Sequence, residues 1–210
     1  YDELTGLANR SLFTARLHEA SQRSRQSGRG IALLHINLDR FKLVNDSLGH
    51  ELADQLLRQV SRRLAQTVPE ADTVARLSGD EFAILLDAYG SLSTLARLAS
   101  RLLSKLRTSM TVGGHELVVS ASLGISLLPD NAREISALVS QANMAMQHSK
   151  HLGGNTFQFF TDNLQACTLE RLRLENQLRK GIQEGQLEVF YRPKLCLGDD
   201  SLNAAEALVR

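Results

Sequence analysis

The stretch Arg76-Leu77-Ser78-Gly79-Asp80-Glu81-Phe82 decides the fold of this chain. Two small residues and two adjacent acids lie between apolar runs at residues 73–77 and 83–86. Strands bury apolar side chains, and a turn that contains glycine lets a ligand or metal approach the backbone closely. The sequence therefore predicts a tight β-hairpin that carries the carboxylates of Asp80 and Glu81 at its tip.

Helical and strand patterns alternate on both sides of this hairpin. A helix is expected to end at Ser27-Gly28-Arg29-Gly30, and a polar turn or short helix is expected over residues 39–46. Further helices are expected at 48–68, Leu92–Leu106, Ile135–His151 and 164–184, and strands at Ile31–Leu38, 117–127, 157–160, 187–191 and Leu202–Val209, with a hairpin turn at Gly113-Gly114. This order predicts an α+β fold with a mixed central sheet flanked by helices.

The composition is that of a globular chain, with 43% hydrophobic and 22% charged residues among 210. A net charge of +1 does not favour general binding to nucleic acid or to an acidic membrane surface. No apolar run reaches the ~20 residues of a membrane span. Cys167 and Cys196 match no metal or redox spacing, which is typical of reduced thiols. We expect a cytoplasmic module cut from a larger protein, whose other parts could still attach it to a membrane.

Two adjacent acids at a strand turn can bind a hard divalent cation, because Mg²⁺ takes oxygen ligands and shares them with phosphates. Two such metals can activate a ribose hydroxyl and neutralise a phosphate during nucleotidyl transfer. The acids alone fit a solvated surface turn better than a metal site. The rest of the chain has to decide between these alternatives.

Several ordered motifs accompany the hairpin. They are Asp2-Glu3-Leu4-Thr5-Gly6-Leu7-Ala8-Asn9-Arg10, then Asp39-Arg40-Phe41-Lys42-Leu43-Val44-Asn45-Asp46, Gly49-His50, Asp54, the S-x-S-x-G pattern of residues 120–124, and Lys150. Over residues 2–160 the chain resembles the GGDEF family, the diguanylate cyclases of bacterial cyclic di-GMP signalling. The resemblance implies a nucleotide-cyclase-like domain at residues 1–161 with a ferredoxin-like βαββαβ core.

The same resemblance implies a nucleotide site. Asp80 and Glu81 would be catalytic, and a Mg²⁺ or Mn²⁺ ion would be held by Asp80, the backbone of Leu38 and the side chain at position 37. Asn45 and Asp54 would read the guanine edge of GTP, while Arg40, Phe41, Lys42, Ser78, Gly79 and Lys150 would surround the nucleotide and its phosphates. A helix-capping Asn, a surface Asp and solvated lysines remain the alternative interpretation of these residues.

The chain departs from the family pattern around this site. Asn37 replaces the metal-binding carboxylate, and Ser78 replaces the first glycine of the signature, which would cost ~1 kcal/mol if the position needs a positive φ. Gly154 stands where an arginine usually meets the phosphates, and Ala53 replaces a glycine before Asp54. Pro69 replaces the arginine of the product-inhibition motif. Together these changes predict a degenerate cyclase with weak metal binding.

The end of the chain resembles the opening of an EAL domain, the family that hydrolyses cyclic di-GMP. The resemblance is carried by Leu187-Glu188-Val189-Phe190-Tyr191-Arg192-Pro193-Lys194 and Ala205-Glu206-Ala207-Leu208-Val209-Arg210. It implies that Glu206 is a metal ligand and that Arg210 lies near the substrate phosphate. Residues 186–210 would be an incomplete EAL fragment, and 162–185 a helical linker, either a rigid connector or an ordinary surface helix.

Three functions remain open from the sequence. The chain could be a regulatory domain that binds GTP and controls an adjoining EAL phosphodiesterase. It could be an active diguanylate cyclase, which would need a homodimer because two GTP molecules are joined. It could also be a protein-interaction scaffold that no longer binds nucleotide.

Overall fold

The structure is a computed structural model of the chain, and it describes residues 1–69, 71–162, 164, 174, 177–196 and 202–209. The chain divides into two compact units, Tyr1–Leu164 and Gln165–Arg210. Each unit is described by itself.

The first unit is built on a five-stranded sheet in the order β2-β3-β1-β6-β7. The strands are β1 (Ile31–Leu38), β2 (Thr73–Ser78), β3 (Glu81–Asp87), β6 (Ala121–Leu128) and β7 (Phe157–Phe159), and only β6 and β7 pair in parallel. The helices are α1 (Arg10–Ser27), α2 (Phe41–Leu48), α3 (His50–Thr67), α4 (Leu92–Leu106) and α5 (Ile135–His151). The predicted mixed sheet with flanking helices is confirmed.

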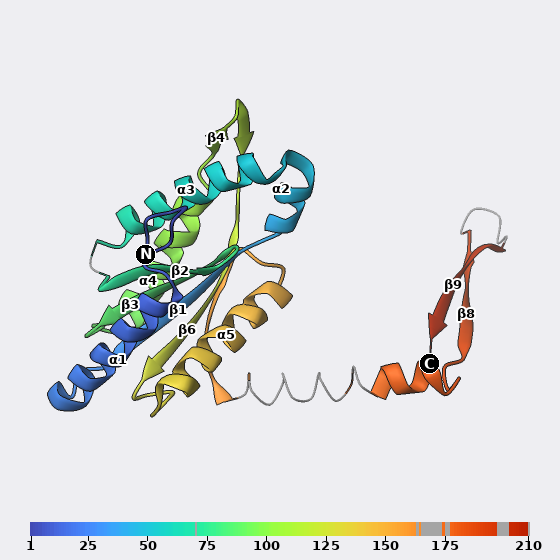
Figure 1. Cartoon of the computed structure of the whole chain (residues 1–210). Helices are drawn as coiled ribbons and strands as arrows, with labels where there is room; N and C mark the ends of the chain where they lie inside the picture. The colour runs from blue at the N-terminus through green and yellow to red at the C-terminus, as the bar shows by residue number, and fades with distance from the viewer. Residues whose placement is uncertain (70, 163, 165–173, 175–176, 197–201, 210) are drawn as a thin grey trace. The chain divides into compact units, whose positions relative to one another are not determined.

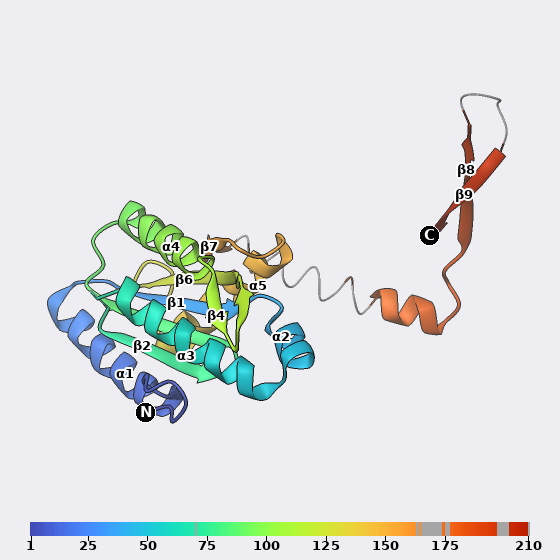
Figure 2. The ribbon, with the colours of Figure 1, turned by 90° about the horizontal axis from the view of Figure 1, so that it is seen from above.

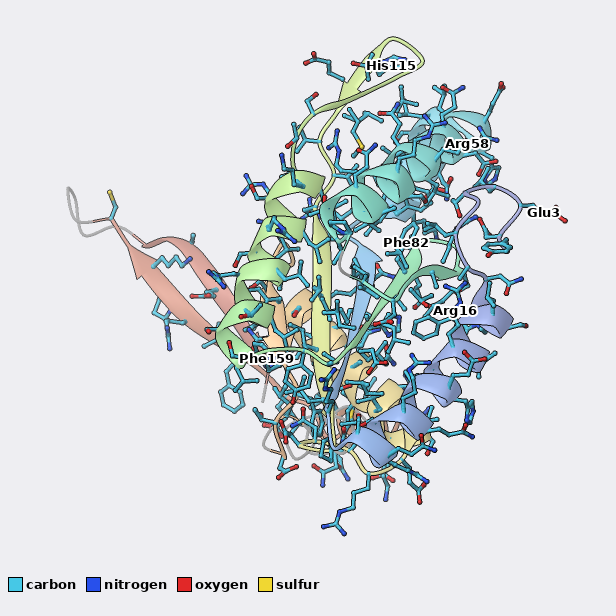
Figure 3. All side chains as sticks on the ribbon, turned by 90° about the vertical axis from the view of Figure 1, so that its left-hand side faces the viewer. Glu3, Arg16, Arg58, Phe82, His115 and Phe159 are labelled. Atoms are coloured by element: carbon cyan, nitrogen blue, oxygen red, sulfur yellow. The ribbon has the colours of Figure 1, made fainter. Side chains whose placement is uncertain are left out.

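Helices cover both faces of this sheet, with α1 and α5 on one side and α3 and α4 on the other (Figures 1 and 2). All side chains of β1 are buried, and they alternate between the two faces. Leu34 and Ile36 pack under α3 and α4, whereas Ile31 and Leu33 pack under α1 and α5. Phe82, next to the acids, is fully buried inside the domain (Figure 3). The hairpin tip is therefore fixed to a well-packed core.

Most predicted elements occur where the sequence places them. Gly28 ends α1 in a left-handed conformation, with φ of 71°, and the polar segment after β1 forms the short helix α2. The expected strand over 117–127 is wrong in one respect, because the chain breaks it. A hairpin of β4 (Met110–Val112) and β5 (His115–Leu117) comes first, and β6 begins only at Ala121. The Ser120 carbonyl accepts the amide of Asp39 (2.9 Å), which ties the break to the end of β1.

One glycine is required by packing between elements. A Cβ at Gly124 of β6 would collide with the backbone of α5 at Ala142 and Met146. The S-x-S-x-G pattern thus lets α5 lie directly on the sheet. This contact positions the end of α5, where Lys150 lies, relative to the strands.

In the second unit, β8 (Val189–Leu195) pairs antiparallel with β9 (Leu202–Val209). The expected strand at 187–191 thus begins two residues later and extends further. Residues 177–183 are helical, but most of the helix expected over 164–184 lies outside the described residues. Cys196 is a free, exposed thiol, and Cys167 lies outside the described residues. None of the described helices is both long and apolar enough to cross a membrane.

Candidate functional site

The acids lie at a two-residue turn, as expected. Gly79 and Asp80 connect Ser78, the last residue of β2, to Glu81, the first residue of β3. The positive φ of this turn falls on Gly79 (46°), and Ser78 is not among the residues with positive φ. The serine in the signature therefore carries no left-handed backbone strain. The cost considered from the sequence does not arise here.

Register places four polar residues in one transverse row across the sheet. Ser78 pairs with Glu81, Glu81 with Asn37 of β1, and Asn37 with Ser122 of β6. Directly paired residues present their side chains on the same face, with Cβ atoms about 4.5–5.5 Å apart. A register shift between Arg76 and Ser78 brings Ser78 opposite Glu81. The Ser78 hydroxyl donates a hydrogen bond to Oε2 of Glu81 at 3.1 Å.

Asp80 is held against the end of β1. Its carbonyl accepts the amide of Leu38 at 3.2 Å. Burial raises the pKa of Asp80 above its ordinary value, while the charge of Lys150 and the Asn37 side chain act in the opposite direction. The structure thus brings Lys150, from the end of α5, close to the acids.

Asn37 is a buried polar residue, with only 5% of its surface exposed. Its Oδ1 atom is buried and has no hydrogen-bond partner within the described part of the chain. An unpaired buried carbonyl oxygen is costly, and a cation is one of the partners that can satisfy it.

Asp39 has a different role, which the sequence analysis did not assign. Its carboxylate accepts hydrogen bonds from the hydroxyls of Ser120 (2.7 Å) and Ser122 (2.6 Å) and from the amide of Asn155 (2.9 Å). A Cβ at Gly154, where φ is 76°, would lie 2.8 Å from this carboxylate. Asp39 therefore joins β1, β6 and the loop after α5, and this loop path suits glycine at position 154.

Arg76 connects the N-terminal loop to the acid turn. Its Nη1 lies 3.2 Å from Oδ1 of Asp2, and its Nε donates to the carbonyl of Gly79 at 2.9 Å. Burial alone would raise the pKa of Asp2, but hydrogen bonds from Thr5 and Arg76 outweigh it and lower this pKa. Ala8 adds backbone hydrogen bonds to β2, so the N-terminal loop packs along the edge of the hairpin.

The expected guanine-reading residues lie on two adjacent helices. Asn45 is on α2 and Asp54 on α3, both are half-buried, and the two helices contact each other. At the start of α2, Arg40 has a left-handed φ of 54° and makes no side-chain cap, so the helix N-terminus is not capped by it. Phe41 is buried in the core, whereas Lys42 is exposed. Their contacts with a nucleotide stay a prediction.

His35, two residues before Asn37 on the same face of β1, gave no sequence signal beyond being a histidine in an apolar run. It is buried, and its Nε2 atom has no hydrogen-bond partner among the residues described. Burial lowers the pKa of His35. This favours the neutral imidazole beneath the acids.

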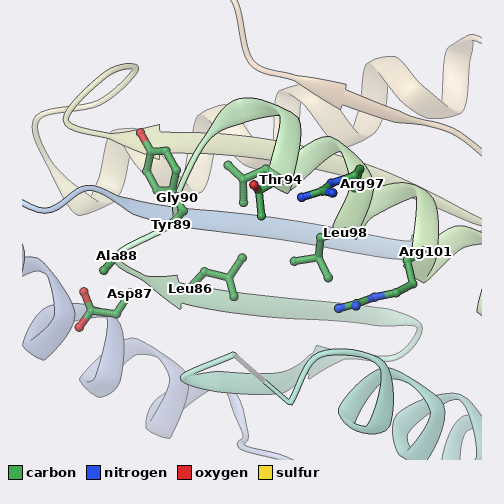
Figure 4. A pocket seen from close by; sticks show the side chains of 10 residues that line it. Leu86, Asp87, Ala88, Tyr89, Gly90, Thr94, Arg97, Leu98 and Arg101 are labelled. Atoms are coloured by element: carbon green, nitrogen blue, oxygen red, sulfur yellow. The ribbon is translucent and has the colours of Figure 1, made fainter.

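A cavity of about 510 Å³ lies away from the acids (Figure 4). It is lined by Leu86, Asp87, Ala88, Tyr89, Gly90, Thr94, Leu95, Arg97, Leu98 and Arg101. These residues lie at the end of β3, in the loop after it and on α4, whereas the acids lie at the start of β3. The cavity is therefore separate from the acid turn.

Comparison with known proteins decides the family. The family model described as "Diguanylate cyclase, GGDEF domain" matches residues 1–156. The chain belongs to the GGDEF family. The solved GGDEF domain of TpbB (YfiN) from Pseudomonas aeruginosa is 33% identical, with a TM-score of 0.78, and the match covers 80% of this chain and 99% of that one.

Two curated relatives from Pseudomonas aeruginosa align with this GGDEF chain along its whole length. One is the cyclic di-GMP phosphodiesterase NbdA, 39% identical over 210 residues. The other is the bifunctional diguanylate cyclase/cyclic di-GMP phosphodiesterase MucR, 38% identical over 210 residues. The chain spans only 27% of NbdA and 30% of MucR. Cyclic di-GMP signalling is thus the context of this GGDEF domain.

The family implies a divalent cation, and the residues fit one by donor type. Asp80 and Glu81 are carboxylates, and the unpaired Oδ1 of Asn37 and the Leu38 carbonyl are neutral oxygens that a hard cation accepts. Across the described ranges, however, no group of three or more His, Cys, Asp or Glu residues could hold a metal ion. The available atoms are oxygens, which a hard cation prefers, but only Asp80 and Glu81 bring negative charge.

In the second unit, Glu206 is exposed on β9 opposite Arg192, and its carboxylate lies 3.9 Å from Nζ of Lys194. Arg210 lies outside the described residues.

Proposed function

We propose that this GGDEF domain binds GTP and regulates an adjoining EAL phosphodiesterase, with weak or no diguanylate cyclase activity. Residues 1–161 would form the regulatory domain, 162–185 the linker and 186–210 the first part of the EAL domain. NbdA aligns with all 210 residues of this chain and is named a cyclic di-GMP phosphodiesterase, which supports this assignment.

The observation that carries the proposal is the neutral side chain at position 37. It brings a neutral amide to the buried position beside Glu81, at a turn whose other carboxylate is Asp80. A bound cation would be held by Asp80, Glu81, the Leu38 carbonyl and Oδ1 of Asn37, and it would supply Lewis-acid stabilisation of phosphate charge. With one carboxylate fewer, the protein neutralises less of that cation's charge. We therefore expect nucleotide binding to survive better than turnover.

Guanine selectivity follows from the chemistry of Asn45 and Asp54. An amide offers a donor and an acceptor, and a carboxylate accepts from the N1 and N2 hydrogens of guanine, which adenine does not present in that pattern. Regulation would require GTP to bind one arrangement of the two domains more tightly than another.

Titration calorimetry of the full chain with GTP, ATP and cyclic di-GMP tests this assignment. We expect GTP to bind selectively, and Asn45→Ala or Asp54→Ala to weaken GTP binding roughly tenfold through lost hydrogen bonds. Asp46→Ala is the matched control, because Asp46 is an exposed acid on the same helix as Asn45. Unchanged GTP affinity in both site variants would refute the guanine-reading roles, and an absence of all nucleotide binding would favour the scaffold.

An active cyclase is the second candidate, favoured by the retained Asp80 and Glu81 and by the similarity to bifunctional MucR. Incubation of the chain with GTP and Mg²⁺ or Mn²⁺ separates the two. We expect little or no cyclic di-GMP from the natural sequence. Abundant product, formed by a dimer, would establish the alternative instead.

A further inference from the structure

Asn37 and Ser78, the two residues that depart from the family pattern next to the acids, flank the same carboxylate. Ser78 pairs with Glu81 on one side and Asn37 pairs with it on the other, all on one face of the sheet. The Ser78 hydroxyl already donates to Glu81. The two departures from the family pattern therefore meet at one side chain.

The substitutions at positions 37 and 78 act on Glu81 in two ways, one through charge and one through hydrogen bonding. A carboxylate at position 37 would lie directly opposite Glu81 and two residues from Asp39, at a position that is 95% buried. Like charges directly opposite across strands are destabilising, and burial increases the penalty. A cation between such carboxylates would relieve this repulsion. An amide at position 37 removes the repulsion at its source, and a hydroxyl at position 78 gives Glu81 a protein hydrogen bond.

We propose that the Ser78 hydroxyl, which donates to Glu81, and the neutral Asn37, which adds no charge opposite Glu81, let the acid turn be ordered in the protein without a divalent cation. The proposal rests on the proposed function only for the identity of the site. Ser78 then stabilises the Glu81 carboxylate through its hydrogen bond and does not disturb the turn. Returning position 37 to aspartate alone should make the stability of the domain depend on metal.

Thermal unfolding in EDTA and in millimolar Mg²⁺, without nucleotide, tests this proposal. It is followed by circular dichroism, because the chain contains no tryptophan. The wild-type midpoint is expected to be the same in both buffers. Asn37→Asp should melt about 5 °C lower in EDTA, equivalent to one or two like-charge contacts in a domain of this size, and should recover in Mg²⁺. Ser78→Ala should melt a few degrees lower, and Ser78→Thr should retain the wild-type midpoint.

Asn143→Asp is the matched control, since it adds the same charge at a half-buried site on α5 away from the row. It should not acquire a Mg²⁺-dependent midpoint. A wild-type midpoint that rises in Mg²⁺ as much as that of Asn37→Asp overturns the proposal, as does an Asn37→Asp midpoint that is equal in both buffers.

A second measurement covers the case in which Asn37→Asp does not fold. Mn²⁺ binding to the nucleotide-free wild type, measured by electron paramagnetic resonance, should be weak. Submillimolar affinity at the acid turn, lost in Glu81→Gln, would contradict a metal-independent row. Neither experiment contains GTP, so a failure of the nucleotide-binding proposal leaves their outcome unaffected.

Discussion

At the scale of single residues, Asp39 shows how one carboxylate can join segments that lie far apart in the chain. Its carboxylate accepts hydrogen bonds from Ser120, Ser122 and Asn155, which lie 81, 83 and 116 positions further along the chain. Removing the carboxylate leaves two hydroxyls and one amide without their partner. Because each such bond is worth about 1 kcal/mol, Asp39→Ala should lower the free energy of unfolding by about 2–3 kcal/mol. Urea unfolding measures this, with the exposed Asp46→Ala as the control.

A free energy of unfolding for Asp39→Ala that equals the Asp46→Ala value within experimental error would mean that water replaces all three hydrogen bonds.

Single residues differ in how far the sequence predicts their roles. Asp80 and Glu81 are recognisable because local turn chemistry surrounds them. The roles of Asp39, Arg76 and His35 arise from contacts between segments far apart in the chain, and no local pattern contains them.

At the scale of elements, the N-terminal loop and the acid hairpin form one structural unit through Asp2 and Arg76. Hydrogen bonds from Thr5 and Arg76 hold the pKa of Asp2 below its ordinary value of 3.8 in the folded protein. A lowered folded-state pKa means that the stabilisation is fully present above the unfolded pKa and is lost as the pH falls through the folded one. We therefore expect the wild type to lose stability below about pH 4 partly through Asp2.

Asp2→Asn tests this, because asparagine cannot lose a charge in acid. The difference in urea midpoint between wild type and variant should be largest at neutral pH and should shrink below pH 3.8. Glu3→Gln, an exposed neighbour, is the control. A difference that stays constant down to the acid limit would show that the Asp2 charge does not contribute.

Elements were also the scale at which the sequence was most informative. Periodic apolar residues located α4 and α5 to the residue, because both bury one face along their whole length. The interruption between β5 and β6 was missed, since apolar residues alternate with small ones from Val119 to Leu127 in the way typical of a single strand. Residues 115–117 pair instead with β4, and the separate pairing with β1 begins only near Ser120, because strand pairing across the sheet overrides local propensity.

At the scale of the whole molecule, the two units should differ sharply in stability. Every buried hydrophobic side chain among the described residues lies between Ala8 and Phe160. The hairpin of β8 and β9 contributes none, and an isolated two-stranded hairpin is marginal in water. A chain ending at Leu164 should therefore melt at the same temperature as the full chain.

A chain lacking residues 1–8 should melt at a lower temperature, because it loses the Asp2–Arg76 ion pair and the backbone hydrogen bonds between Ala8 and β2. Calorimetric scans of the three proteins decide this, and a lower midpoint for the chain ending at Leu164 would mean that residues 165–210 stabilise the GGDEF domain directly.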